Sequence, residues 1–124
     1  MPTPAARSSR QLALLIAASA LVLARPAASA DAAPYVGTWA LDVATCKTPQ
    51  ESQDAPLVIA KDRYDQHEVH CTFKSVTPND SDYRIAGDCM VEGNAQSYDF
   101  TLTVSGDTLS FTDEAGARDF LRCK

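Results

Sequence analysis

Two imidazoles and a carboxylate lie within four residues, His67-Glu68-Val69-His70, and these side chains are common in zinc sites and in proton transfer. The zinc-protease motif H-E-x-x-H places its histidines four residues apart on one face of a helix. Here the spacing is three, and the surrounding residues alternate as in a strand. His67 and His70 should then point to opposite faces, so that only Glu68 and His70 can meet. We therefore expect no metal site, and a charge-paired surface strand instead.

Other catalytic patterns are absent from the sequence. The serines have no G-x-S-x-G context, and the five glycines are isolated, so no glycine-rich loop can cradle a phosphate. The acidic residues are scattered over turns, and a small barrel offers little room for the cleft that a glycosidase-type carboxylate pair needs. The sequence predicts a protein that is not an enzyme and that holds no cofactor.

The four cysteines are Cys46, Cys71, Cys89 and Cys123, and no C-x-x-C occurs. An even number of cysteines in a short exported chain predicts disulfides, and four cysteines allow three pairings. We predict Cys46–Cys71, which would tie a long polar loop to a central strand, and Cys89–Cys123, which would pin the last strand. The rival pairing is Cys71–Cys89 across the hairpin centred on Asp80, together with Cys46–Cys123.

The N-terminus has the three parts of a secretory signal peptide. Arg7 and Arg10 precede a short apolar run, residues 12–24, and Ala28-Ser29-Ala30 is an A-x-A cleavage site. The run is shorter than the about 20 residues that span a membrane. We expect residues 1–30 to be removed and residues 31–124 to form a single domain, periplasmic or secreted, with no membrane anchor. An uncleaved N-terminal anchor is the alternative.

The charge is strongly asymmetric. Three of the 11 basic residues and none of the 16 acidic residues lie in the first 30 positions. The acidic remainder should repel nucleic acid and anionic membranes. It would suit a cationic partner, although an acidic surface can also serve solubility alone.

Period-2 alternation of apolar and polar residues recurs along the chain and predicts strands, with turn residues such as those at 77–81, 92–94 and 105–107 between them. We predict an all-β fold, an antiparallel meander of about seven strands in a closed or nearly closed barrel stapled by two disulfides. A two-layer sandwich is the alternative. The expected strands cover residues 35–41, 57–60, 64–76, 83–91, 98–104, 109–111 and 117–123, and Asp42 can cap one helical turn through Cys46.

The first expected strand contains the only tryptophan, in Gly37-Thr38-Trp39. Gly37 would allow a close approach of another group, and Trp39 would fill the floor of the barrel, with a partner for its indole N–H. Four further apolar residues should fill the interior of so small a barrel and leave little cavity: Tyr98, Phe100, Leu102 and Phe111.

The segment Val36–Leu41 resembles the G-x-W signature in the first strand of lipocalin-like (calycin) barrels, including small periplasmic barrels that inhibit secreted metalloproteases. The resemblance implies a core-floor role for Trp39 and a close-contact role for Gly37. This chain departs from lipocalins in being shorter and in having two expected disulfides. The order Trp39–Cys46–Cys71–Cys89–Cys123 also looks like small exported proteins of Gram-negative bacteria whose function is unknown.

These patterns favour an exported, monomeric, non-enzymatic binding protein, in the narrowest form an inhibitor of a secreted protease or of lysozyme. Lysozyme is cationic and would be steered toward an acidic surface. The loop Lys47–Pro56 and the segment Asp31–Pro34 are the candidates to enter a cleft. The alternatives are a carrier of a small hydrophobic ligand and an envelope structural or stress protein with no discrete site.

Overall fold

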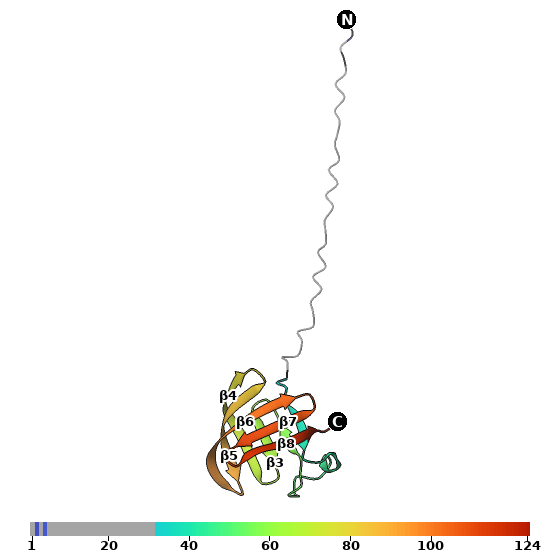
Figure 1. The fold of residues 1–124 in the computed structure, drawn as a ribbon. Helices are drawn as coiled ribbons and strands as arrows, with labels where there is room; N and C mark the ends of the chain where they lie inside the picture. Colours follow the sequence, from blue (N-terminus) through green and yellow to red (C-terminus); the bar gives the residue numbers. More distant parts are fainter. Residues whose placement is uncertain (1, 3, 5–31) are drawn as a thin grey trace.

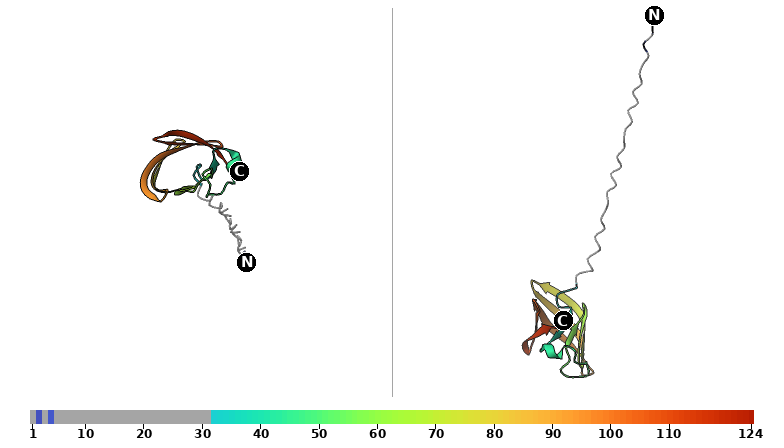
Figure 2. Two further views of the ribbon diagram at one scale, coloured as in Figure 1. Left: turned by 90° about the horizontal axis from the view of Figure 1, so that it is seen from below. Right: turned by 90° about the vertical axis from the view of Figure 1, so that its right-hand side faces the viewer.

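The protein forms a closed antiparallel barrel in which each strand pairs with the next and the last pairs with the first. The computed structural model describes residues 2, 4 and 32–124, so the apolar run and cleavage site of the predicted signal peptide lie outside the described residues. Figure 2 (left) shows the strands as a ring seen from one end. The elements are β1 (Gly37–Ala40), η1 (Val43–Thr45), β2 (Leu57–Ile59), β3 (Arg63–Gln66), β4 (Val69–Asn79), β5 (Asp82–Val91), β6 (Asn94–Ser105), β7 (Thr108–Asp113) and β8 (Gly116–Arg122).

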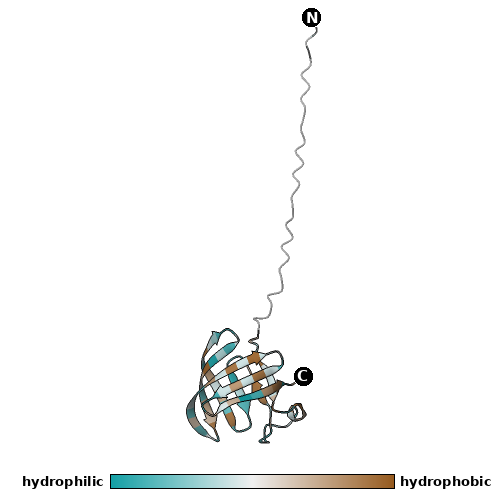
Figure 3. Ribbon diagram, in the orientation of Figure 1, coloured by the Kyte–Doolittle hydropathy of each residue, from teal (hydrophilic) through white to brown (hydrophobic). Residues whose placement is uncertain are grey.

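The predicted fold class is confirmed: the described chain is an all-β closed barrel with two disulfides, and no sandwich forms. It has eight strands where about seven were expected, because residues 64–76 form parts of two strands. His67 has a positive φ of 52° and stands in a tight turn between Gln66 and Val69, which pair with each other. Hydropathy alternates along the strands in Figure 3, with the apolar side chains inward.

One end of the barrel is closed around Trp39, which has no exposed surface. Its indole Nε1 donates a hydrogen bond to the carbonyl oxygen of Tyr35 at 2.9 Å. The guanidinium of Arg122, from β8, lies 4.2 Å from the centre of the indole ring. Arg122 also donates to the carbonyl oxygens of Pro34 at 3.1 Å and of Val36 at 3.5 Å. A single arginine thus joins the last strand to the residues that lead into the first.

Gly37 is required at this end for two reasons. Its φ of +150° lies in the region that L side chains rarely adopt. A Cβ at this position would also lie 3.1 Å from Nη1 of Arg122. A side chain at this position would therefore press on the guanidinium of Arg122 and require it to shift.

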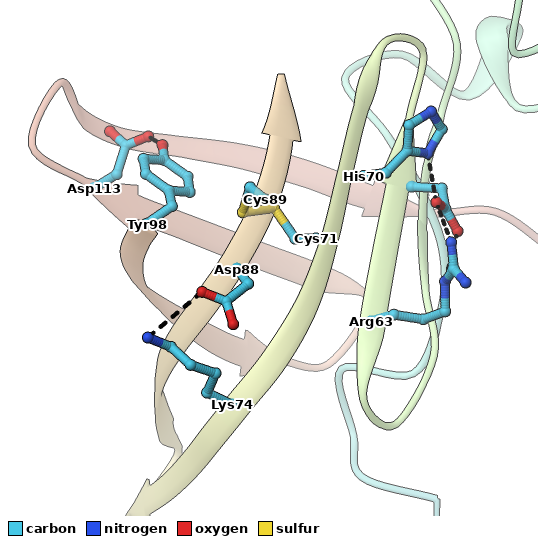
Figure 4. Close-up of a disulfide and its surroundings, with 9 residues drawn as sticks. Arg63, His70, Cys71, Lys74, Asp88, Cys89, Tyr98 and Asp113 are labelled. Atoms are coloured by element: carbon cyan, nitrogen blue, oxygen red, sulfur yellow. Dashed lines mark hydrogen bonds and ion pairs between the residues drawn. A yellow bond between two sulfur atoms is a disulfide. The ribbon is translucent and has the colours of Figure 1, made fainter. Parts of the chain in front are cut away.

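The disulfides are Cys46–Cys123 and Cys71–Cys89, so the predicted pairing is wrong and the rival pairing is correct. Cys71 and Cys89 lie directly opposite each other on β4 and β5, with their Cα atoms 4.0 Å apart, and both face the interior. Figure 4 shows the bridge between the two strands. Cys46 directly follows η1 and bonds to Cys123 after β8, whereas Cys71 is buried in the core.

Cys123 reaches Cys46 because β8 returns beside β1. The backbone N–H of Cys123 donates to the carbonyl oxygen of Thr38 at 2.8 Å, and η1 begins three residues after β1 ends. The 77-residue separation of Cys46 and Cys123 exceeds the 18-residue separation of Cys71 and Cys89. On the chain-entropy estimate the longer loop contributes about 4.5 kcal/mol and the shorter about 3 kcal/mol.

Replacement of Trp39 tests the closed end. Trp39→Ala should lower the free energy of unfolding by about 3–5 kcal/mol, because it empties the floor of the barrel and removes the surface under Arg122. Trp39→Phe should lose less, because a ring remains under the guanidinium. Urea unfolding followed by far-ultraviolet circular dichroism measures both, and a loss below about 1 kcal/mol for Trp39→Ala would contradict this account.

Candidate ligand site at the open end of the barrel

The end of the barrel opposite Trp39 is open and contains a cavity of about 210 Å³. Its walls come from side chains near the β3–β4, β5–β6 and β7–β8 turns, because inward-facing positions alternate along every strand. The apolar part is Leu57, Tyr64, Val69, Val91, Phe111 and Phe120, and the polar part is Gln66, Gln96, Tyr98 and Arg118. The interior is therefore not filled as completely as the sequence indicated.

Tyr98 accounts for much of this difference. The sequence places it among the core-filling residues with Phe100, Leu102 and Phe111, and those three are buried. Tyr98 is only partly buried, and its hydroxyl donates a hydrogen bond to the carboxylate of Asp113. Its ring thus lines the cavity. Its hydroxyl lies beside the carboxylate of Asp113 (Figure 4).

The floor of the cavity is formed by the rings of Tyr64 and Phe111, and Phe100, which does not line the cavity, packs against both. Phe100 and Phe111 are stacked with their ring centres 4.7 Å apart. Tyr64 meets both rings edge to face, at 5.4 Å from Phe100 and 5.8 Å from Phe111. Such contacts fix the ring positions, so the floor is formed before any ligand arrives.

Tyr64 lines the cavity and carries a hydroxyl group. Tyr64 is only 4% exposed, and its hydroxyl makes no hydrogen bond within the described part of the chain. No fully buried side-chain oxygen or nitrogen of that part lacks a partner, so this hydroxyl keeps some solvent-accessible surface. Burial raises its pKa, so the group stays protonated and can donate a hydrogen bond to a molecule in the cavity.

Asp113, at the end of β7, organises the rim. Its side chain is only 4% exposed and accepts hydrogen bonds from Tyr98, from the backbone N–H of Ala115 at 2.8 Å and from Arg118 at 2.7 Å. The hydrogen bond from Tyr98, more than any other contact, holds the pKa of Asp113 below its usual range. Burial, and next the hydrogen bond to this carboxylate, raise the pKa of Tyr98 to about 12.

Arg118 is the cation at the cavity. It pairs across the strands with Phe111, and its guanidinium lies 5.2 Å from the centre of that ring. One nitrogen, Nη2, donates to Asp113, whereas the side chain is 52% exposed. A guanidinium has five N–H donors, so donors remain for a ligand. Asp113 already accepts three hydrogen bonds and acts by orienting Arg118 and Tyr98.

The loop Lys47–Pro56 lies beside the open end (Figure 1) and is fastened there by side-chain hydrogen bonds. The Gln66 side chain donates to the carbonyl oxygen of Ala55 at 3.3 Å. The Gln50 side chain accepts from the backbone N–H of His67 at 2.7 Å and donates to the carbonyl oxygen of Pro56 at 3.0 Å. The His67 ring also contacts the Gln50 carbonyl at 2.9 Å. This loop is therefore held in one arrangement.

The two histidines do not act together. His67 belongs to the turn and the loop contacts, and its Nε2 is 4.0 Å from Glu68. His70 pairs with Asp65 at 2.6 Å and not with Glu68 as expected, because the turn moves Glu68 out of the strand. Among residues 32–124 no group of three His, Cys, Asp or Glu side chains is placed to hold a metal ion.

Arg63 completes this surface cluster by donating two hydrogen bonds to Asp65, at 2.7 and 3.1 Å. Partial burial opposes ionisation of Asp65, but the hydrogen bonds from Arg63 and His70 outweigh it and lower the pKa. Figure 4 shows the cluster on the outer side of the strands. It stabilises a surface hairpin and has no contact with the cavity.

The two expected inserting segments lie at opposite ends of the barrel (Figure 1). Residues 32–34 lie at the closed end, where Pro34 accepts a hydrogen bond from Arg122, and Asp31 lies outside the described residues. The sequence reasoning missed Tyr64, Asp113 and Arg118. The available signal was Arg118, a cation two residues before Phe120 and thus on the apolar face of its strand.

Scans of protein-family models, of curated proteins and of solved structures each gave no match to this chain. Within the described residues no helix has the length and hydrophobicity needed to cross a membrane. The two disulfides are compatible with an exported protein.

The Tyr98–Asp113 pair can be tested by titration. Tyr98→Phe should remove one tyrosine that ionises near pH 12. Asp113→Asn should lower the pKa of Tyr98, because the neighbouring negative charge is lost while burial remains. Phenolate absorbance read within milliseconds of a pH jump, before alkaline unfolding, measures both.

The same shift has a consequence for stability. A folded-state pKa raised above the ordinary value of about 10 adds stability that is complete below pH 10. That stability is lost as the pH rises through about 12. An unchanged Tyr98 pKa in Asp113→Asn would show that the carboxylate does not act on the phenol.

Proposed function

We propose that this protein is a non-enzymatic binding protein, exported to the periplasm or the medium, that holds a small ligand at the open end of its barrel. One observation carries the proposal: the Tyr64 hydroxyl, unpartnered in the described chain, and the half-exposed Arg118 both face a preformed aromatic cavity. Concave apolar sites with a few convergent polar groups are typical of ligand sites. The groups at the rim are hydrogen-bond donors and one carboxylate that already accepts three hydrogen bonds, which suits binding better than catalysis.

The size and chemistry of the cavity define the ligand class. Its volume of about 210 Å³ is below the about 300–1,000 Å³ of sites for drug-sized ligands, so the ligand is smaller than these. The walls favour an aromatic or compact aliphatic body. Tyr64 and Arg118 both donate, so the polar end of the ligand must accept hydrogen bonds. A small aromatic carboxylate meets all three conditions.

The calycin resemblance belongs to this proposal. A barrel closed by Trp39 at one end and open at the other supports a ligand-holding role, as does the rigid aromatic floor. The export expected from residues 1–30 is supported by two disulfides, which persist in oxidising compartments.

Titration with defined small molecules tests the proposal. Phenylacetate, benzoate and indole-3-acetate should bind better than benzyl alcohol, and the amide resonances that shift in NMR spectra should be those of residues around the open end. Hydrogen bonds to a charged group contribute about 1.5–3 kcal/mol, so Arg118→Gln should weaken carboxylate binding by about tenfold or more. Tyr64→Phe should weaken it less.

Arg84→Gln is the matched control, because Arg84 is exposed on β5 and does not line this cavity. It should leave binding unchanged. Failure of every probe to shift these resonances at millimolar concentration would refute the proposal, as would equal binding by wild type and Arg118→Gln.

Inhibition of a secreted protease or lysozyme is the second candidate function, and the fastened loop favours it. Hydrogen bonds at Gln50 and Gln66 hold the loop Lys47–Pro56, while Glu51 and Asp54 stay exposed. A rigid loop loses little conformational entropy on binding.

If the loop inhibits a cationic lysozyme, the purified protein should inhibit it stoichiometrically and less at high salt. Glu51→Arg with Asp54→Arg should abolish the effect, and Asp88→Arg on β5 should retain it. Inhibition insensitive to the loop changes would exclude this role for the loop.

A further inference from the structure

A second concave surface lies outside the barrel wall, between η1 and the end of β8. It is a groove of about 540 Å³ that shares no lining residue with the cavity at the open end. One wall contains Val43, Ala44, Cys46 and Lys47, and the other contains Leu121, Arg122 and Lys124, with Asp107 from the β6–β7 turn. Figure 1 shows the C-terminus beside this short helical segment.

The middle of the groove is apolar and exposed. Val43 is 60% exposed and Leu121 is 41% exposed. These are two of the five large apolar side chains that stay exposed in the described chain, and both line one groove. Single exposed apolar residues are ordinary, but apolar residues that line a common concave surface, rimmed by charge, mark an interaction site.

The charge of the groove is opposite to that of the rest of the surface. Residues 32–124 contain eight Lys or Arg, and three of them line the groove, with only Asp107 of the fifteen acidic residues. Lys124 at 2.9 Å and Arg122 at 3.6 Å pair with Asp107, and the hydrogen bond from Lys124 holds the pKa of this carboxyl low. Lys47 has no ion-pair partner among the described residues. Cations remain in excess even if Lys124 carries a free α-carboxylate.

The two walls are fixed to each other. The Cys46–Cys123 disulfide joins them covalently. Asp42 caps η1, since its carboxylate accepts from the backbone N–H of Ala44 at 2.9 Å, and its carbonyl accepts from the Thr45 hydroxyl at 2.7 Å. The groove therefore exists before binding, which lowers the entropic cost of an association.

We propose that this groove binds a peptide segment of a partner protein in which an aliphatic side chain is flanked by acidic residues. The aliphatic side chain covers Val43 and Leu121, and the carboxylates pair with Lys47 and with the exposed Lys124. Charge complementarity selects an acidic partner, which the remaining acidic surface of this protein would repel. The groove thus has the opposite charge preference to the exposed Glu51 and Asp54 of the neighbouring loop, and it does not involve the barrel cavity.

Fluorescence polarisation with three labelled peptides tests the charge and the apolar requirement together. The probes are Asp-Glu-Leu-Val-Glu-Asp, its lysine counterpart Lys-Lys-Leu-Val-Lys-Lys, and Asp-Glu-Ser-Ser-Glu-Asp. Only the first should bind well, and its affinity should fall as salt rises. Amide resonances of residues 43–47 and 121–124 should shift.

Variants then locate the site. Lys47→Glu and Val43→Asp should each weaken binding of the first peptide by about tenfold, and Arg84→Glu, a charge reversal elsewhere on the surface, should not. Arg118→Gln should also leave peptide binding intact, so a failure of the cavity proposal and a failure of this one can be told apart. Equal binding of all three peptides, or full binding by Lys47→Glu, would overturn the proposal.

Discussion

The contact of Arg122 with Trp39 is the interaction on which the barrel depends. A cation over an indole contributes about 0.5–2 kcal/mol, depending on how far it is desolvated. Here the same guanidinium also donates to two carbonyl groups of the segment before β1. β1 has only four residues and pairs with β8 at two positions, so backbone pairing alone is a weak closure. The side chain supplies the connection that the short strand lacks, and Gly37 gives it room.

The sequence predicts those features of the fold that depend on residues close together along the chain, and it does not predict those that depend on distant residues. The Gly37-Thr38-Trp39 strand, the alternation on β5 and β6 and the barrel class follow from local patterns, and the structure has them. The disulfide pairing does not, because it depends on which cysteines become neighbours in the sheet. Cys71 and Cys89 face each other through the register of the long β4–β5 hairpin. The expected strand 64–76 is divided into β3 and β4 by the positive φ of His67. The alternation of apolar and polar residues does not reveal this backbone conformation.

The open-end site was less predictable for a related reason. Tyr98 has the pattern of a core residue, and only the placement of Asp113 at the end of β7 gives its hydroxyl a partner and keeps it at the rim. Arg118 and Phe111 become neighbours through the β7–β8 pairing. Only every second side chain of a strand faces the interior, so one strand contributes few residues to the end of a barrel. A site there is therefore assembled from several hairpins. Motif searches read one segment at a time and miss such sites.

The Cys46–Cys123 bridge also determines how this molecule responds to force. It turns the chain from β2 to β8 into one covalent loop, with β1 and the preceding residues outside it. Tension applied between the two ends is carried by the bridge and cannot peel β8 from the sheet. Only β1 and η1 can extend, and Arg122 and the β1–β2 pairing resist that. Under oxidising conditions the strands from β2 to β8 therefore bear none of the applied force, and reduction of the disulfide by a thiol would expose them to it.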